Sequence, residues 1–300
     1  MSRRRKGRDI HGVILLDKPA GYSSSQAVLK VRWLFQARKA GHTGSLDPFA
    51  TGMLPICLGE ASKTAGFMLD ASKTYIAAAF LGKATTTGDI EGETSREMKV
   101  PDLDDAQINA VLNEFLGKIE QVPPMYSALK HQGQPLYKLA RAGQEVARKA
   151  RPVTIHSLEL LNWAPPMLEF RVHCSKGTYV RTLAEDIAEK LGSCAHLQSL
   201  RRLDVEPFLE KDMITLEELL ARAEADVLDD CLLPVDSGLI DWPMVTLDEN
   251  SMIRFCHGNP VEQAVEVPGL VRVYGPEQKL LGVGEILPDN QLKPKRIMHS

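Results

Sequence analysis

Short apolar runs, each closed by glycine or proline, limit this chain to short strands and short helices. The run from His11 to Asp17 is long enough for one buried strand, and Lys18-Pro-Ala-Gly21 ends it. Ser23-Ser-Ser-Gln26 is a capping-box pattern, which predicts the start of a helix. The apolar face of that helix is formed by Val28, Val31, Leu34 and Phe35.

Elements of both types alternate in this way down to residue 225. We expect strands at 73–82, 154–161 and 168–174, the last two separated by a turn at Pro165-Pro166. We expect helices at 103–116 and 216–225, and another that begins at the capping box Thr182-Leu-Ala-Glu185 and ends at Gly192. The alternation predicts a mixed α+β domain.

A domain boundary is expected near Trp242-Pro243. Beyond it the pattern predicts a short strand, a helix ending at Gly258, and a strand-turn-strand unit over 270–287. We therefore divide the chain into a basic tail (1–10), a large α+β domain (11–243) and a small β-rich domain (244–300).

Composition places the 300-residue chain among ordinary globular proteins, with 44% hydrophobic and 25% charged residues. No apolar run approaches the roughly 20 residues of a membrane helix, and the basic N-terminus leads into no apolar signal segment. The cysteines are odd in number and form no C-x-x-C pair. We expect them to be small buried hydrophobes in a cytoplasmic protein.

The charges are segregated along the chain. The formal net charge is −3, which taken alone argues against binding to nucleic acid. Residues 1–40 nevertheless hold ten Lys and Arg against two acidic residues, and residues 125–155 hold six against one. Residues 203–250 hold two against fourteen. Such segregation can create a basic face for phosphates, but a set of solvated faces without a partner explains the charges equally well.

One loop combines unusual backbone residues with an aspartate. Gly41-His-Thr-Gly-Ser-Leu-Asp-Pro-Phe-Ala-Thr-Gly52 holds three glycines and a proline around Asp47. Glycines allow backbone conformations that present a side chain into a cleft, and Pro48 leaves Asp47 no helix to cap. The local pattern alone favours an Asx-turn aspartate, with a catalytic carboxylate as the alternative.

Four motifs in order resemble those of the TruB family, the bacterial tRNA pseudouridine-55 synthases. Residues 41–59 resemble the catalytic-aspartate motif of that family. The other matches are Leu16-Asp-Lys-Pro-Ala-Gly-Tyr-Ser-Ser24, Lys73-Thr-Tyr75 with Thr87-Gly-Asp-Ile-Glu-Gly-Glu93, and Cys174-Ser-Lys-Gly-Thr-Tyr-Val-Arg-Thr-Leu-Ala184 with His196-Leu-Gln-Ser-Leu-Arg-Arg202. Together they cover most of residues 11–202, in the order of the family.

The resemblance implies a reaction and a catalytic group. Isomerising uridine requires cleavage of a C–N glycosidic bond and reattachment through carbon, which a covalent intermediate divides into easier steps. Asp47 would be the nucleophile, attacking either the uracil ring or the ribose. Arg181 would pair with it and hold it ionised, and Tyr75 would stack on the extruded uracil or remove the last proton.

The resemblance also implies substrate contacts. His42 would fill the place of the flipped base, Tyr179 and Leu200 would line the uracil pocket, and Lys18 and Pro19 would support its floor. An insertion at about 125–152 would clasp the T-arm of tRNA. Its phosphate-binding candidates, with two arginines from the last motif, are Lys130, Lys138, Arg141, Arg148, Lys149, Arg151, Arg201 and Arg202.

The implied fold is the pseudouridine synthase fold, with a central mixed, largely antiparallel sheet and a small PUA-like C-terminal domain. We expect no cofactor, no metal in the chemistry and no membrane association. We also expect no obligate protein partner, and a monomer. The RNA affinity and any further RNA substrates stay open.

Other functions can be weighed from the same residues. A P-loop fails because Ala77 and Ala84 stand where glycine and Ser/Thr are required. A metal hydrolase built on Asp89, Glu91 and Glu93 lacks a nearby histidine. A non-catalytic RNA-binding protein would need the basic segments but not Asp47, Tyr75 and Arg181 together. A guide-RNA-directed synthase is the fourth candidate, and the short C-terminal module favours the stand-alone form.

Overall fold

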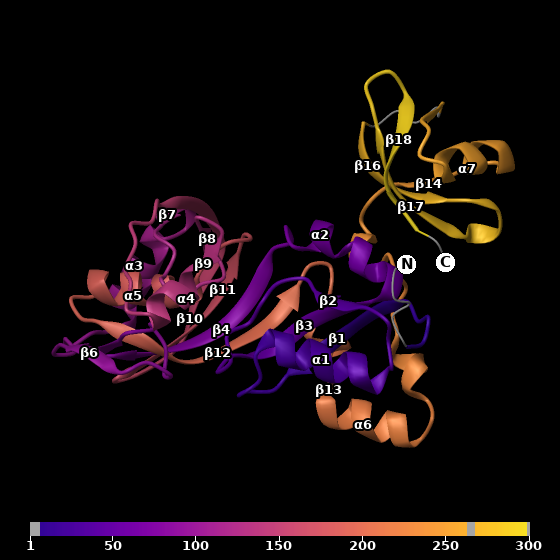
Figure 1. Ribbon diagram of the computed structural model, residues 1–300. Helices are drawn as coiled ribbons and strands as arrows, with labels where there is room; N and C mark the ends of the chain where they lie inside the picture. Colours follow the sequence, from indigo (N-terminus) through magenta and orange to yellow (C-terminus); the bar gives the residue numbers. More distant parts are fainter. Residues whose placement is uncertain (1–6, 263–267, 299–300) are drawn as a thin grey trace.

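A nine-stranded sheet forms the framework of the larger part of the molecule. The computed structural model describes residues 7–262 and 268–298 (Figure 1), so most of the predicted basic tail, residues 1–6, lies outside the described residues. The strands of the large sheet are β1 (Gly12–Lys18), β2 (Ala40–His42), β3 (Thr51–Leu58), β4 (Lys73–Leu81), β7 (Gly117–Gln121), β10 (Arg151–Ala164), β11 (Met167–Cys174), β12 (Ala195–Val205) and β13 (Ile214–Thr215).

The strand order is β13-β1-β3-β12-β4-β11-β10-β7, with β2 paired to β3. The β1–β13 and β3–β12 pairs are parallel, and the other described pairs of this sheet are antiparallel. The expectation of a mixed, largely antiparallel sheet is confirmed.

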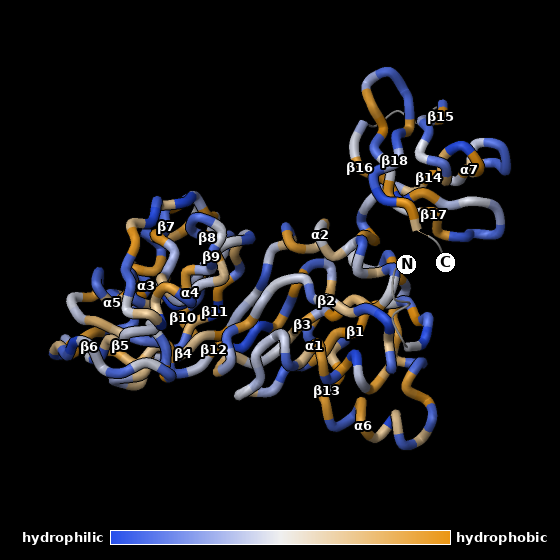
Figure 2. Tube along the Cα trace, in the orientation of Figure 1, coloured by the Kyte–Doolittle hydropathy of each residue, from blue (hydrophilic) through white to orange (hydrophobic). Residues whose placement is uncertain are grey.

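Helices cover the sheet at its two ends (Figure 1). They are α1 (Ser24–Leu34), α2 (Ala65–Met68), α3 (Asp105–Glu114), α4 (Leu136–Arg141), α5 (Val180–Lys190) and α6 (Leu216–Glu224). One hydrophobic core packs α3 and α5 against β4, β10, β11 and β12, and a second packs α1 and α6 against β1 and β3. Figure 2 shows the corresponding apolar segments at β1, β3 and α1. The long strand β12 contributes Leu197 and Leu200 to the first of these cores and Val205 to a third core.

Most of the predicted helices and strands are confirmed, and one helix start is wrong. The capping box at Ser23 and Gln26 is formed with both hydrogen bonds. The box expected at Thr182 is not formed, because α5 begins at Val180 with Tyr179 as its N-cap residue and no side-chain cap. Val180 and Arg181 are both buried, so tertiary contacts extend the helix before the local signal.

The segment between β7 and β10 forms the predicted insertion. It contains the short strands β8 (Lys130–His131) and β9 (Gln134–Pro135) and the helix α4. Many of its residues are exposed, but α4 buries Leu136 and Leu139. The strand expected at 154–161 is longer, because β10 spans the whole return from the insertion to the Pro165-Pro166 turn. A second excursion follows β4, as the hairpin β5 (Lys83–Thr85) and β6 (Thr94–Glu97).

The C-terminal domain is a five-stranded sheet with one helix, which is two strands more than the sequence predicted. Its elements are β14 (Met244–Thr246), α7 (Glu249–Cys256), β15 (Val261–Glu262), β16 (Gly269–Tyr274), β17 (Leu280–Ile286) and β18 (Gln291–Ile297). It has its own apolar core. Arg272 attaches it to the larger part of the molecule by bonding to Asp236 Oδ2 at 3.0 Å and to the Ile240 carbonyl at 3.0 Å.

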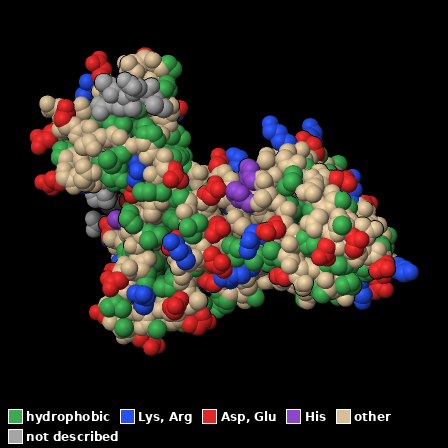
Figure 3. Space-filling view, turned by 180° about the vertical axis from the view of Figure 1, so that it is seen from behind, with side chains coloured by type: hydrophobic (Ala, Val, Ile, Leu, Met, Phe, Trp, Pro, Cys, Tyr) green, Lys and Arg blue, Asp and Glu red, His purple; other side chains and the backbone are tan. Residues whose placement is uncertain are grey.

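The surface seen from behind is mixed in charge (Figure 3), with acidic and basic side chains interspersed. Ion pairs between neighbouring strands, such as Arg171 with Glu159 at 3.4 Å, account for part of this pattern. The five cysteines are free, and Cys57, Cys174 and Cys194 are buried as expected, whereas Cys231 and Cys256 are half-buried. In the described part of the chain, no helix is long and apolar enough to cross a membrane.

Candidate active site

The loop that carries Asp47 is held in place by buried polar side chains. Ser24, at the start of α1, donates to the Leu46 carbonyl at 2.9 Å and accepts from the Leu46 N–H at 2.7 Å. Because the serine binds both backbone groups of the residue before Asp47, the loop is fixed where the carboxylate leaves the backbone. Leu46 and Ala50 also pack into the core beside Tyr75.

Lys18 supports the same loop from below. Its side chain is fully buried, and Nζ donates to the carbonyls of Pro19, Tyr22 and Pro48 at 2.9, 2.7 and 3.2 Å. Burial lowers the pKa of Lys18 to about 8, and the nearby Asp47 opposes that shift. The lysine therefore acts through backbone carbonyls, one of them directly after Asp47.

Arg202 binds the other side of the loop, which corrects one prediction. It is 1% exposed, and its guanidinium donates to the carbonyls of Met53 at 2.6 Å, Gly44 at 3.2 Å and Ser45 at 3.4 Å. The expectation that Arg202 binds phosphate is wrong, because its donors are used inside the protein. Arg201 points outward but forms a bidentate pair with Asp17 at 2.9 and 3.0 Å, so its charge is already compensated.

Arg181 lies at the centre of a buried ionic network. Its Nε is 3.0 Å from Asp47 Oδ2, and its Nη1 is 3.3 Å from Asp89 Oδ2. It also donates to the carbonyls of Thr87 at 2.7 Å and Tyr126 at 2.8 Å. The side chains of Arg181 and Asp89 are 5% and 4% exposed, whereas that of Asp47 is 37% exposed. Of these three charged side chains, only that of Asp47 is substantially exposed to solvent.

The electrostatics of this network do not favour the charge on Asp47 uniformly. Burial raises the pKa of the Asp47 carboxyl, Arg181 opposes the rise, and Asp89 adds to it. Burial and the neighbouring Asp89 and Asp47 also raise the pKa of Glu91. Two carboxylates near one arginine leave a local excess of negative charge, which Lys18 offsets in part.

Four further predicted residues lie on the elements around the loop. Tyr75 on β4 and Leu200 on β12 are 8% and 7% exposed and belong to one core cluster with Leu46. Tyr179 is the half-buried N-cap residue of α5. His42 ends β2, its Nδ1 accepts from the Gly44 N–H at 3.2 Å, and burial beside Arg202 lowers its pKa.

The basic side chains of the insertion are not part of this cluster, although the Tyr126 carbonyl is. Lys130, Lys138, Arg141 and Lys149 are exposed, and the Arg141 guanidinium lies 5.8 Å from the centre of the Tyr137 ring. Arg148 is different, because its Nη1 donates to the Pro123 carbonyl at 3.2 Å and closes the base of the insertion. These exposed basic residues lie between β7 and β10, in a part of the chain separate from the Asp47 loop.

Sequence reasoning missed Asp89 as a member of the site. The sequence suggests a role for Asp89 only as a ligand of a rejected metal site, but the side chain is buried and accepts from Thr87 Oγ1 and, at 3.1 Å, from the Glu91 N–H. The preceding Gly88 was the available signal. Its φ of +73° favours glycine, and a Cβ there would lie 2.9 Å from Glu185 Oε1, so any other residue would be strained and would displace that side chain.

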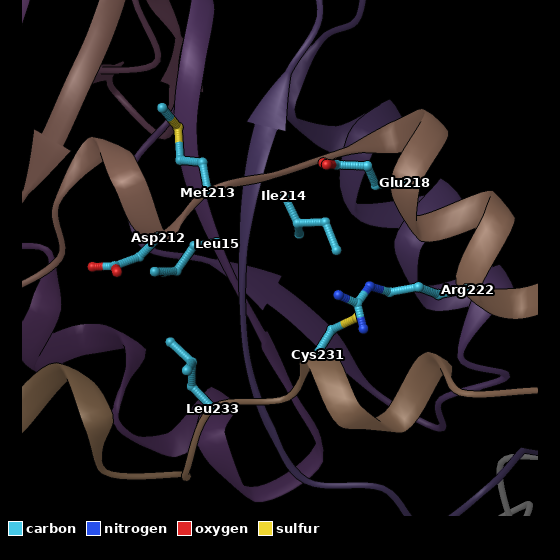
Figure 4. Close-up of a pocket in the computed structure, with 8 residues that line it drawn as sticks. All are labelled: Leu15, Asp212, Met213, Ile214, Glu218, Arg222, Cys231 and Leu233. Carbon is cyan, nitrogen blue, oxygen red and sulfur yellow. The ribbon is translucent and has the colours of Figure 1, made fainter.

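A small hollow elsewhere is separate from this site. It has a volume of about 230 Å³, and Ile214, Glu218, Arg222 and Cys231 are among its lining residues (Figure 4). Burial raises the pKa of Cys231, so its thiol is a weaker nucleophile than usual. None of the predicted site residues lines it.

Comparison with known proteins agrees with the geometry. Residues 32–180 match the model of the TruB family pseudouridylate synthase N-terminal domain. Residues 181–240 match the tRNA pseudouridylate synthase B C-terminal domain, and residues 243–298 match a TruB C-terminal model of pseudouridine synthase II. The three matches follow one another over most of the chain.

Individual relatives extend the match to the whole chain. tRNA pseudouridine synthase B of Pseudomonas fluorescens is 50% identical over 99% of this chain and 98% of its own length. The enzyme of that name from Pseudomonas aeruginosa is 50% identical over 99% of both chains.

Among solved structures, a chain of a Cbf5-Nop10-Gar1 complex aligns with a TM-score of 0.75 and 26% identity, covering 95% of this chain and 84% of that one. A chain of an H/ACA RNP bound to a substrate RNA, at 23% identity and a TM-score of 0.74, shares the fold over 100% of this chain and 92% of its own. With its motifs in order and its relatives matched end to end, the chain belongs to the TruB family of pseudouridylate synthases.

Proposed function

We propose that this pseudouridine synthase converts the T-loop uridine of tRNA, position 55 in the family, to pseudouridine with Asp47 as its nucleophile. The observation that carries the proposal is the ion pair of a 37% exposed Asp47 with a 5% exposed Arg181. A buried arginine fixes the carboxylate while leaving one side of it open to a substrate.

Each neighbour of Asp47 has a chemical role in this proposal. Arg181 keeps the carboxylate ionised and aimed for attack on the uracil ring or the ribose. Burial raises the pKa of Tyr75, so its phenol keeps its proton at neutral pH. A protonated tyrosine serves better as a stacking surface for uracil than as a base for the last proton, which favours stacking as its role.

The target uridine must leave its stack to reach Asp47. Tyr179 and Leu200 lie on the elements that flank the Asp47 loop, in positions suited to a uracil pocket. We assign His42 to the space left by the flipped base. Its lowered pKa makes the ring neutral at pH 7, so it can stack without adding charge. Lys18 and the Pro19 carbonyl form the floor.

The RNA partner is assigned from the relatives and from the insertion. Relatives that match this chain end to end are named tRNA pseudouridine synthases. Exposed Lys130 and Arg141 on the insertion are suited to the phosphates of a T-arm, which position RNA without reading its sequence. We also propose the division at residues 10, 125–152 and 243, an RNA-binding C-terminal domain, a monomer without an obligate protein partner, and a cytoplasmic location.

The direct test is tritium release from a tRNA transcript labelled with [5-³H]uridine. We expect release by the wild type, none by Asp47→Asn, and normal release by Asp102→Asn, which changes an exposed aspartate outside the site. A transcript with cytidine at the target position should release no tritium from that site. Tight tRNA binding without release by the wild type would instead favour the non-catalytic RNA-binding alternative.

A further inference from the structure

Gln121 makes an unusual connection between the insertion and helix α5. It is the last residue of β7, its side chain is 2% exposed, and it lies 58 residues from its partner. Its Oε1 accepts from the Tyr179 N–H at 3.0 Å, and its Nε2 donates to the Tyr179 carbonyl at 3.4 Å. The buried amide of Gln121 therefore binds both backbone groups of Tyr179, the N-cap residue of α5.

This connection satisfies one backbone donor at the start of a helix that has no side-chain N-cap. The first N–H groups of a helix have no partner within the helix, and a nearby Ser, Thr, Asp or Asn usually supplies one. Tyr179 makes no side-chain cap hydrogen bond. The backbone at the start of α5 is instead fixed by Gln121, and Arg181 follows Tyr179 by two residues. The position of the Arg181 guanidinium on α5 thus depends on the side-chain amide of Gln121 on β7.

The same part of the chain holds Arg181 a second time. The insertion leaves the sheet directly after Gln121 and returns at Arg151, which is the residue opposite Gln121 in the β7–β10 pair. Within the insertion, the Tyr126 carbonyl accepts from Arg181 Nη2 at 2.8 Å. Arg148 closes the base of the insertion on the Pro123 carbonyl. A shift of the residues at which the insertion leaves the sheet would therefore reach Arg181 by two routes. One is the Gln121–Tyr179 hydrogen bond, and the other is the bond from Arg181 to the Tyr126 carbonyl.

We propose that Gln121 is a positioning residue, which fixes the start of α5 and so couples the RNA-binding insertion to the Arg181–Asp47 pair. The inference rests on the proposed function, since it assigns Gln121 a role in that reaction. Gln121 does not reach the reacting atoms; it acts through Tyr179 and Arg181. A purely structural cap would affect the stability of α5 and leave the chemistry of the folded enzyme unchanged.

The test compares three variants with the wild type in single-turnover tritium release at saturating enzyme, alongside tRNA Kd by filter binding. Gln121→Met keeps the shape of the side chain and removes both hydrogen bonds. Gln121→Glu keeps the acceptor of the 3.0 Å bond. Thr64→Val is the matched control, because it removes hydrogen bonds of 2.8 Å to the Ala61 carbonyl and 3.3 Å to the Val235 carbonyl, neither of which belongs to the Asp47 network. Thermal melts select a temperature at which all four proteins are folded.

We expect Gln121→Met to lower the single-turnover rate by roughly 10- to 100-fold without weakening tRNA binding, since misplacement by about 1 Å has effects of that size. The acid limb of its rate–pH profile should move to higher pH, because a displaced Arg181 stabilises the Asp47 carboxylate less. Gln121→Glu should retain most of the rate at a pH at which its buried carboxyl is protonated and can still donate to the Tyr179 carbonyl, and Thr64→Val should retain wild-type values.

Two results would overturn the inference while leaving the proposed function intact. One is an active wild type with a Gln121→Met rate and pH profile like those of Thr64→Val. The other is a loss confined to tRNA affinity, with the saturated rate unchanged. An inactive wild type would overturn the proposed function and this inference together.

Discussion

Asp47 and Asp89 bind the same guanidinium, that of Arg181, at 3.0 and 3.3 Å. Burial raises the pKa of Asp47, Arg181 opposes that rise, and the charge of the nearby Asp89 adds to it. In return, Asp89 fixes the direction of Arg181 and hence of Asp47. The site therefore holds the Asp47 carboxylate in a fixed orientation without stabilising its ionised form as strongly as possible. This combination suits a nucleophile that must form and break a bond.

Replacing Asp89 by asparagine tests whether its charge fixes the direction of Arg181. Asp89→Asn keeps the shape but removes the charge that aligns Arg181, so we expect a fall in the single-turnover rate on the order of 10²-fold. The Kd for tRNA should stay at the wild-type value, because the side chain is buried. Glu93→Gln is the control, since it removes an exposed carboxylate from the same turn. Equal rates for the two variants would contradict a special role for Asp89.

The pH dependence of the reaction should reflect the raised pKa of Asp47. A nucleophilic carboxylate must be ionised, so the rate falls as the pH falls through its pKa. Because burial raises that pKa, the acid limb should lie above the usual value of about 3.9 for aspartate. Single-turnover rates between pH 4 and pH 8 measure the limb. Arg181→Lys, which holds the carboxylate less well, should move it to still higher pH. A wild-type rate that stays constant down to pH 4 would disagree with this assignment.

A site residue could be predicted only where the sequence immediately around it indicates its role. The Asp47 loop was recognisable because its glycines and proline stand in a fixed order around one acid. Asp89 was not, because its one local signal, Gly88, does not by itself distinguish a carboxylate that enters the core from one in a solvated turn. Its partner Arg181 is 92 residues further along the chain, and only the folded sheet brings them together.

Arg202 and Thr182 show two other limits. Two adjacent arginines are typical of a phosphate-binding surface, but successive residues of a strand point to opposite faces. Arg201 consequently faces solvent and Asp17, whereas Arg202 enters the core beneath the Asp47 loop. At Thr182 the local capping pattern was sound, but contacts made by Val180 and Arg181 began the helix earlier. The strands expected at 73–82 and 168–174 and the other expected helices were predictable because their apolar spacing is a local property, whereas β3, β7, β12 and β18 were not predicted.

Glu185 should make the stability of the protein depend on pH. Burial, followed by repulsion from Asp186, raises its pKa to about 7 in the folded state. A carboxyl whose folded pKa is raised favours folding below its unfolded pKa and loses that contribution as the pH rises through 7. Glu185→Gln should therefore stabilise the protein by on the order of 1 kcal/mol at pH 8 and have little effect at pH 4.5. Urea unfolding at both pH values, with exposed Glu189→Gln for comparison, measures this. The same gain at both pH values would rule out this ionisation as its source.

Gly52 should be irreplaceable where β3 meets β12. Its φ is +98°, and a Cβ there would lie 2.1 Å from the Arg202 carbonyl oxygen. We expect Gly52→Ala to destabilise the protein by more than about 3 kcal/mol, because strain and a backbone clash act together. Gly143 also has a positive φ, +70°, but a Cβ there would meet no neighbouring side chain or backbone within 4 Å. Gly143→Ala therefore isolates the strain and should cost about 1 kcal/mol. Similar unfolding free energies for the two variants would argue against the clash.

The salt dependence of tRNA binding should identify which basic residues meet phosphate. Each phosphate contact releases counterions, so its loss reduces the slope of log Kd against log salt by about 1. Lys130→Gln with Arg141→Gln removes two exposed charges from the insertion and should reduce the slope by about 2. Arg201→Gln is the matched control. Its guanidinium is neutralised by Asp17 and Glu210, and we expect no change in slope. If Arg201→Gln alone reduced the slope, the phosphate-binding surface would lie beside β12, and the insertion would lose its assigned role in holding the T-arm.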